Sequence, residues 1–216
     1  GWGHGGEPGK PNAAGYIEVQ AIANWNLATL ARMRQHGIAL PPDLLDKGLS
    51  YLRDCIKEGG VCYSSTKPGN TGNPQPGRTA SGLFVFWCAD LTGDQRYREM
   101  TGYCGDHFKD LFVGHSASTM HFLASGLAAS RQPDLQAKFW AEYLPRMESL
   151  RMADETFALW PADVTHREDP SKSQKYNPEA PLGKNWPMSV HAVILQLPKG
   201  RLFAPAPRKG GGGRKG

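Results

Sequence analysis

The sequence lacks any apolar run of the length that a membrane helix needs. The longest candidate, residues 190–197, is interrupted by His191 and Gln196 and falls well short of the ~20 residues required. Hydrophobic residues make up 39% of the chain and charged residues 21%, which is the balance of a globular protein and not of a disordered one. We therefore expect a folded protein without a membrane partner.

Cysteine is scarce, and none of the four cysteines belongs to a CxxC pair. This absence argues against a zinc ribbon. Cys88 and Cys104 lie on consecutive predicted helices, but their positions relative to the intervening turn leave an axial mismatch of ~10 Å, too far for a disulfide. We expect free, buried thiols, which leaves the redox compartment and the localisation open.

The motifs of several enzyme classes are also missing. The chain has no GxGxxG fingerprint and no P-loop, since no helix follows the GGGGRK string near its end. The string GHSAS at residues 114–118 has serine where a GxSxG nucleophile elbow requires glycine. His115 and His121 are six residues apart and so point to different faces of a helix, where they cannot share a metal ion. We expect no cofactor and no metal.

Positive charge is concentrated near the C-terminus. Four of the five net positive charges come from the string APRKGGGGRKG, which contains Arg208, Lys209, Arg214 and Lys215. Basic charge on a glycine-rich tail indicates at most a weak contact with nucleic acid. We expect a helical domain at residues 1–200, followed by a basic flexible tail at 201–216.

What the sequence does contain is a phrase that returns four times. A glycine-rich turn is followed by an aromatic, basic or amide residue and then by a helix start rich in small residues. The four copies are GYIEVQAIANWNLATLA from Gly15, GRTASGLFVFWCA from Gly77, GHSASTMHFLASGLAA from Gly114 and GKNWPMSVHAVILQL from Gly183. Amphipathic segments such as 42–58 and 134–152 lie between them. The alternation predicts an all-α array of antiparallel helical hairpins.

The predicted helices form two sets, of which the first is rich in small and apolar residues. The first set comprises 16–35, 78–90, 115–130 and 187–198, and the second comprises 42–58, 94–112 and 134–152. We expect the first set to form one layer and the second to pack outside it. Long loops at 59–77, beginning with a short hairpin, and at 156–181 complete the array.

The turn units resemble those of the α/α-toroid superfamily, which includes terpenoid cyclases, protein prenyltransferase β-subunits and complement-type thioester domains. GGVCY at residues 59–63 before GRTASGLF is similar to the turn between an outer and an inner helix, and GWGHGG and FALWPADV are similar to variants of it. The resemblance covers most of residues 1–200 and is closest to a bacterial branch that implies no particular reaction. With fewer inner helices than a full toroid needs, we expect the C-terminal part of a larger toroid or an open arc.

The departures from this superfamily limit what the resemblance implies. The acidic DxDD cluster, the QW repeats and the thioester CGEQ string are all missing. Cys88 and Cys104 lie within helices, and no Asp-x-Cys string accompanies them, so the zinc site of the prenyltransferases is not implied either.

Candidate functional residues gather at the rim where helix N-termini and turns meet. Arg78 and His115 each follow a glycine and open a helix, so they could face one another near Tyr63. An arginine to neutralise a carboxylate, with a tyrosine or histidine as base, is what β-elimination of an acidic sugar requires. In the alternative interpretation, Arg78 and His115 only hydrogen-bond loop carbonyls.

Other side chains at this rim are candidates for ligand binding. They are Tyr16, Trp160, Asn185, Trp186 and His191. Exposed tryptophans stack on sugars, whereas buried ones anchor loops. Three hypotheses follow. The protein is a recognition or scaffold domain that presents its rim and concave face to a glycan or peptide. Alternatively, it is a polysaccharide lyase or hydrolase that uses Arg78, His115 and Tyr63, or an assembly subunit of an oligomer or larger parent protein with a basic tail.

Overall fold

The computed structural model describes residues 20–65, 72–114, 118–160 and 179–199. Within these ranges the chain is mainly helical and has one two-stranded sheet, which confirms the predicted all-α class. The expectations for the first turn, for Tyr16, for His115 and for the tail at 201–216 concern residues outside this part of the chain.

The described elements follow one another in the order expected from the sequence. The helices are α1 (Gln20–Gln35), α2 (Leu44–Asp54), α3 (Pro76–Cys88), α4 (Gln95–Asp106), α5 (Ser118–Ala129), α6 (Pro133–Ser149) and α8 (Asn185–Gln196). The strands are β1 (Ile56–Lys57) and β2 (Gly60–Val61), and short 3-10 helices span Phe108–Asp110, Ala180–Leu182 and Leu197–Lys199.

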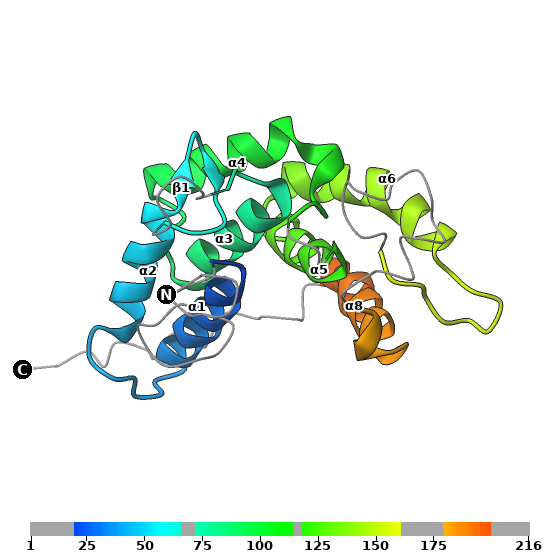
Figure 1. Ribbon diagram of the computed structural model, residues 1–216, viewed down its shortest axis with the longest axis horizontal. Coiled ribbons are helices and arrows are strands. Elements are labelled where there is room, and N and C mark those ends of the chain that lie inside the picture. Colours follow the sequence, from blue (N-terminus) through cyan, green and yellow to red (C-terminus); the bar gives the residue numbers. More distant parts are fainter. Residues whose placement is uncertain (1–19, 66–71, 115–117, 161–178, 200–216) are drawn as a thin grey trace, which may run out of the picture.

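The helices form two layers of an arch. Each of α1, α3, α5 and α8 packs against the next in this series, while α2, α4 and α6 pack on α1, α3 and α5, respectively. Figure 1 shows the first series, the inner layer, along the concave side of the arch and the second series, the outer layer, along the convex side. This is the arrangement that we expected for the two sets of helices.

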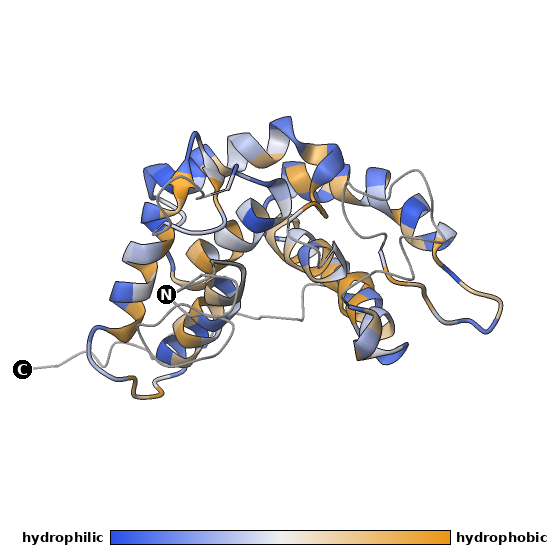
Figure 2. Ribbon diagram, in the orientation of Figure 1, coloured by the Kyte–Doolittle hydropathy of each residue, from blue (hydrophilic) through white to orange (hydrophobic). Residues whose placement is uncertain are grey.

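Composition explains which helices lie inside. α5 has no charged residue, and ten of its twelve residues are buried. α3 carries only Arg78 as a charged residue, and twelve of its thirteen residues are buried. A helix that is apolar on nearly all sides must be covered on all sides. Figure 2 shows the difference, since α5 is mainly hydrophobic whereas α2, α4 and α6 each have hydrophilic positions.

Small residues bring the inner helices close together. A Cβ added at Gly126 of α5 would lie 3.2 Å from Ile194 of α8 and 3.3 Å from Phe139 of α6. The larger core side chains gather between α5 and α6, where the ring of Phe122 lies 5.5 Å from that of Phe139 and 4.2 Å from that of Trp160. Such aromatic pairs add to the stability that burial of apolar area supplies.

Two helices end four or more residues before their predicted ends. The helix predicted at 42–58 ends at Asp54, because Glu58 and Gly59 have φ angles of 50° and 77° and form the tight turn between β1 and β2. The predicted hairpin therefore exists but begins before Gly59. The helix predicted at 94–112 ends at Asp106 and is followed by the separate 3-10 helix Phe108–Asp110.

The four cysteines are free and buried, as expected. Burial raises the pKa of Cys88 to about 12 and also raises the pKa of Cys104, so both thiols stay protonated at neutral pH. Such thiols pack as small hydrophobic groups and are poor nucleophiles.

Candidate functional site

The N-terminal ends of α3, α5 and α8 lie side by side, at what we call the N-terminal edge. The backbone N–H of Gly77 in α3 donates to the carbonyl of Val113, 2.7 Å away and just before α5. The start of α5 is in turn joined to the start of α8 through Glu179. The starts of three inner helices are therefore held together at this edge.

Arg78 lies at this edge but faces the interior. Arg78 is only 3% exposed. Its guanidinium donates hydrogen bonds to the carbonyl oxygens of Gly114 at 2.8 Å, Asn73 at 2.7 Å and Val61 at 3.3 Å. Its guanidinium carbon lies 5.5 Å from the ring centroid of Tyr63, which is also buried. Arg78 thus joins the hairpin, the loop before α3 and the segment before α5. This agrees with the alternative interpretation for Arg78, in which it only hydrogen-bonds loop carbonyls.

The side chain of Glu179, which is not part of α5, binds the backbone of the first turn of that helix. Its carboxylate accepts hydrogen bonds from the backbone N–H groups of Thr119 at 2.8 Å and Met120 at 3.0 Å, and from the indole N–H of Trp186 at 2.9 Å. The first amides of a helix have no partner within the helix, so a carboxylate there stabilises the helix end. The N–H groups of Thr119 and Met120 are therefore bound by a carboxylate of the chain itself.

Sequence reasoning missed Glu179 because no local pattern marks it. A helix cap is normally recognised from the residue directly before the helix, whereas Glu179 lies 60 positions beyond Thr119. Only the packing of α8 against α5 brings the two together.

The two described tryptophans of the predicted site, Trp160 and Trp186, contact other parts of the protein. Trp160 is 3% exposed, packs 4.2 Å from Phe122 and 5.4 Å from Phe112, and its backbone N–H donates to the hydroxyl of Thr119. Trp186 is half-buried and is held by Glu179. Both anchor loops to the core, while Asn185 is exposed at the start of α8.

His191 is fully buried beside the segment that follows α6. Its ring stacks on Phe157 with a centroid distance of 4.3 Å and an interplanar angle of 5°. Nδ1 lies 2.7 Å from the carbonyl oxygen of Pro187, so Nδ1 carries the proton, and Nε2 is buried without a hydrogen-bond partner among the described residues. Burial lowers the pKa of His191, which keeps the ring neutral.

A hollow at the surface of the inner layer lies toward the C-terminal ends of α1, α3 and α5. We call it the inner groove; its volume is about 410 Å³. Its lining comes from Trp25, Ala28, Thr29, Arg32, Met33 and His36 of α1, Ile38 after α1, Phe84 of α3 and Leu127 of α5. None of the described residues of the outer layer is part of this lining.

The inner groove has a cationic edge built around Trp87. The guanidinium carbon of Arg32 lies 6.0 Å from the Trp87 ring centroid and that of Arg131, just after α5, lies 4.2 Å from it. The Trp87 ring also stacks with Phe84 of the groove lining, at 6.1 Å between centroids. Burial lowers the pKa of Arg131, and the like charge of Arg32 lowers it further.

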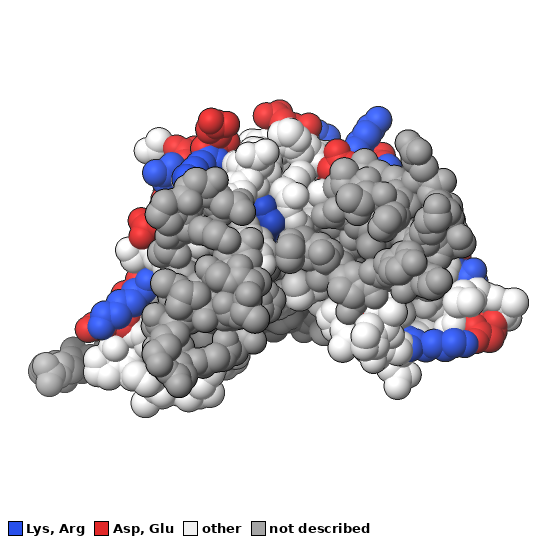
Figure 3. Space-filling view, in the orientation of Figure 1, with Lys and Arg blue, Asp and Glu red and all other residues white. Residues whose placement is uncertain are grey.

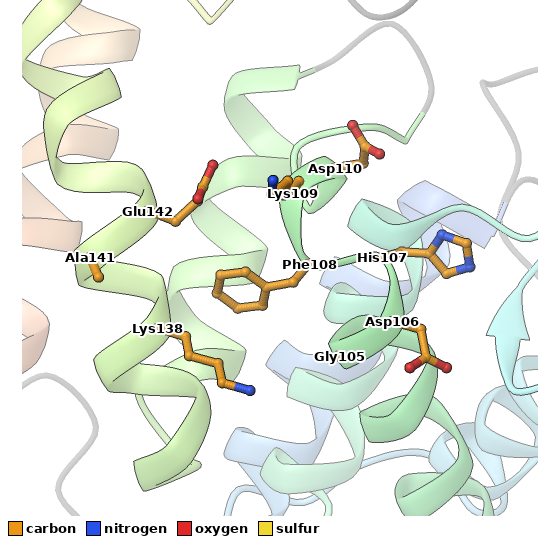
Figure 4. Close-up of a pocket in the computed structure, with 9 residues that line it drawn as sticks. All are labelled: Gly105, Asp106, His107, Phe108, Lys109, Asp110, Lys138, Ala141 and Glu142. Carbon is orange, nitrogen blue, oxygen red and sulfur yellow. The ribbon is translucent and has the colours of Figure 1, made fainter.

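A second hollow, of about 590 Å³, lies between the end of α4 and α6. Figure 4 shows the ring of Phe108 pointing toward α6, while the side chains of Asp106 and His107 point away from it. Glu142 is paired with Arg146. Asp106 and His107 therefore do not converge with the side chains of α6 on one point, as a base and a charge stabiliser in catalysis must.

Charge elsewhere is mixed. Figure 3 shows acidic and basic side chains interspersed along the convex side of the arch. Among the described residues, no group of three or more His, Cys, Asp or Glu side chains is placed to hold a metal ion. None of the helices in the described ranges is long and apolar enough to cross a membrane.

Comparison with known proteins gives no match to a family model, to a curated protein or to a solved structure. The inner groove was not predicted from the sequence, although Trp25, Phe84 and Leu127 of its lining belong to the recurring phrases that we identified. Their alignment depends on three helices that are far apart in the chain.

Proposed function

We propose that the protein is a recognition domain that binds a peptide in the inner groove. The observation that carries this proposal is the lining of the groove, in which Trp25, Met33, Ile38, Phe84 and Leu127 supply most of the surface. Concave, mainly apolar hollows with a few polar groups are the usual form of a binding site.

The same lining favours a peptide over a glycan. A sugar presents several hydroxyl groups, and each needs a hydrogen-bond partner when it is buried. Thr29, Arg32 and His36 are the polar side chains of the lining, and Thr29 already donates to the carbonyl of Trp25 at 2.9 Å. An apolar side chain of a peptide needs no such partners and gains free energy by leaving water.

The lyase or hydrolase hypothesis has less support from the geometry. Its residues Arg78 and Tyr63 are buried at the N-terminal edge, and Arg78 donates to three carbonyls there. Neither residue lines the inner groove or the hollow beside α6. The assembly hypothesis rested on the basic tail, which lies outside the described residues.

The two-layer arch supports a wider proposal, that the fold is an open arc of the α/α-toroid type. In such an arc the inner helices line a concave face, and the described lining of the inner groove comes from the inner helices α1, α3 and α5 and the residues after α1. A binding role for the concave face is what stacked helical repeats commonly provide.

A displayed random peptide library tests the proposed function. We expect the protein to enrich peptides with a large apolar residue, and Thr29→Trp, which places a bulky ring at the exposed Thr29, to weaken their binding by roughly tenfold or more. Thr101→Trp on α4 is the matched control, because Thr101 also donates to the carbonyl four residues earlier but lies in the outer layer.

Fluorescence anisotropy with labelled peptides measures the affinities, and melting temperatures verify that both variants fold. Enrichment of no peptide, or equal binding by the wild type and Thr29→Trp, would contradict a groove that binds peptides. Binding of arrayed glycans without binding of peptides would favour the other ligand class.

A further inference from the structure

The inner helix α8 has the composition of a buried helix but is buried on one side only. Like α5, it contains no charged residue. Ten of the twelve residues of α5 are buried, whereas only four of the twelve in α8 are, namely Pro187, Val190, His191 and Ile194. These four form the side of α8 that packs on α5. A helix without charge on any side is typical of one that is covered on more than one side.

A second row of apolar residues runs along α8 beside the buried side. Met188, Ala192 and Leu195 follow one another at spacings of four and three residues, so they lie along one face of the helix. Leu195 is 40% exposed, Ala192 is exposed and Met188 is half-buried. We call this row the α8 stripe. Figure 1 shows α8 as the last labelled helix of the inner layer, at one end of the arch.

The spacing of the α8 stripe makes it complementary to itself. Ala192 lies four residues after Met188 and three residues before Leu195. In an antiparallel pair of α8 helices related by a two-fold axis at Ala192, Met188 of each copy meets Leu195 of the other, and the two alanines meet at the centre. An interface on a two-fold axis requires the same patch on both copies to fit itself in this way.

Charge also permits this pairing. Identical surfaces that meet on a two-fold axis bring like charges together, and α8 has none to bring. The stripe is flanked by the uncharged polar residues Asn185, Ser189 and Gln196. Lys184 precedes the helix and forms an ion pair with Asp154 at 2.7 Å. Antiparallel pairing also places the N-terminal end of each helix dipole beside the C-terminal end of the other, which is favourable.

We propose that two copies of this chain associate through the α8 stripe as an antiparallel, two-fold dimer. The inference is independent of peptide binding, because no residue of α8 is part of the described lining of the inner groove. A helix of 12 residues is only ~18 Å long, so this pair buries less than the ~1,600 Å² of a standard interface. We therefore expect a weak dimer, with a dissociation constant in the micromolar range.

Sedimentation equilibrium of the whole chain from about 1 µM to about 1 mM tests the association, since this range spans micromolar dissociation constants. We expect monomer at the low end and dimer at the high end. Leu195→Glu places a carboxylate in the apolar contact and should raise the dissociation constant by roughly tenfold or more. Leu144→Glu is the matched control, because Leu144 is similarly exposed, at 38%, but lies on the outer helix α6.

A single cysteine tests the two-fold axis. Ala192→Cys places the same thiol on both copies at the centre of the proposed interface, where the pair can approach to disulfide distance. Dioxygen with a copper catalyst accepts the two electrons, and the two thiols lose their protons as the S–S bond forms. The four native cysteines are buried, so we expect a covalent dimer from Ala192→Cys and little from the control Leu144→Cys.

Each possible outcome supports or overturns the proposal. A wild-type chain that stays monomeric up to about 1 mM would overturn it. A dimer that is unaffected by Leu195→Glu would assign the association to another surface. Loss of the dimer in Leu195→Glu without cross-linking of Ala192→Cys above its control would overturn the two-fold arrangement. Melting temperatures verify that each variant is folded.

Discussion

At the scale of single residues, Arg78 and Glu179 have opposite charges but a similar structural role. Each is almost fully buried, and each forms hydrogen bonds with backbone groups outside its own segment of the chain. Arg78 supplies donors to carbonyls, whereas Glu179 supplies acceptors to N–H groups. Buried charges are tolerated where hydrogen bonds compensate for the loss of water, and both residues meet this condition.

Replacing Arg78 with methionine should therefore lower stability strongly. The variant keeps the aliphatic part of the side chain but leaves the carbonyls of Gly114, Asn73 and Val61 without this donor. We expect a loss of about 3 kcal/mol or more, since each bond to a charged group contributes ~1.5–3 kcal/mol and they are not additive. Urea unfolding at equilibrium provides the measurement.

The matched control is Arg98→Met, because Arg98 is exposed and donates to a single carbonyl, that of Gly93. We expect it to lose less than ~1 kcal/mol. An Arg78→Met protein of normal stability that has lost a ligand would restore the catalytic or binding role considered from the sequence.

His191 should make stability depend on pH. Its folded pKa is below its unfolded value because of burial, so the unfolded chain binds the proton more readily. The contribution of the neutral ring is complete above the unfolded pKa of about 6.5 and is lost as the pH falls through the lower folded pKa. Stability should therefore fall on acidification.

The variant His191→Phe isolates this effect, since phenylalanine keeps a ring against Phe157 and cannot titrate. Between about pH 7.5 and 5.5 its melting temperature should fall less than that of the wild type. Identical pH profiles for the two proteins would show that His191 takes up no proton on unfolding.

At the scale of elements, glycines mark where segments approach most closely. Gly114 precedes α5 in the chain, and a Cβ added there would overlap the ring of His121. Gly102 lies in α4, is exposed and would meet nothing within 4 Å. The two positions differ in surroundings, although neither has a positive φ angle.

Alanine at these two positions should have opposite effects. Gly114→Ala should destabilise the protein by about 1–3 kcal/mol, the usual cost of overpacking. Gly102→Ala should stabilise it by about 0.5–1 kcal/mol, because alanine loses less conformational entropy in a helix. Thermal unfolding followed by circular dichroism measures both, and a stable Gly114→Ala protein would mean that the His121 ring can move aside.

The elements also show what the sequence could predict. The composition of α3 and α5 identified them as inner helices, because burial on all sides is a local property of the pattern. The end of α2 was predicted four residues too late, since the turn at Glu58 and Gly59 places a non-glycine residue at positive φ. Such a turn follows from pairing of β1 with β2 and not from propensity.

At the scale of the whole molecule, each inner helix contacts its neighbours in the layer and its partner outside. The two layers could be predicted from the sequence because the two helix types alternate along it. The inner groove could not be predicted, because Trp25, Phe84 and Leu127 come together only through the packing of three repeats. The contact between Arg131 and the Trp87 ring was not predicted for the same reason, since Trp87 lies on α3.

The alignment of the inner helices has an electrostatic consequence. α1, α3 and α5 run parallel, with their final turns meeting around Trp87 and the starts of α3 and α5 meeting at the N-terminal edge. Peptide dipoles in parallel helices add, which places partial positive charge at one end of the layer and partial negative charge at the other.

Glu179 lies at the positive end of this field, and Arg32 and Arg131 lie at the negative end. Each charge therefore stabilises the helices as well as the contacts that it makes.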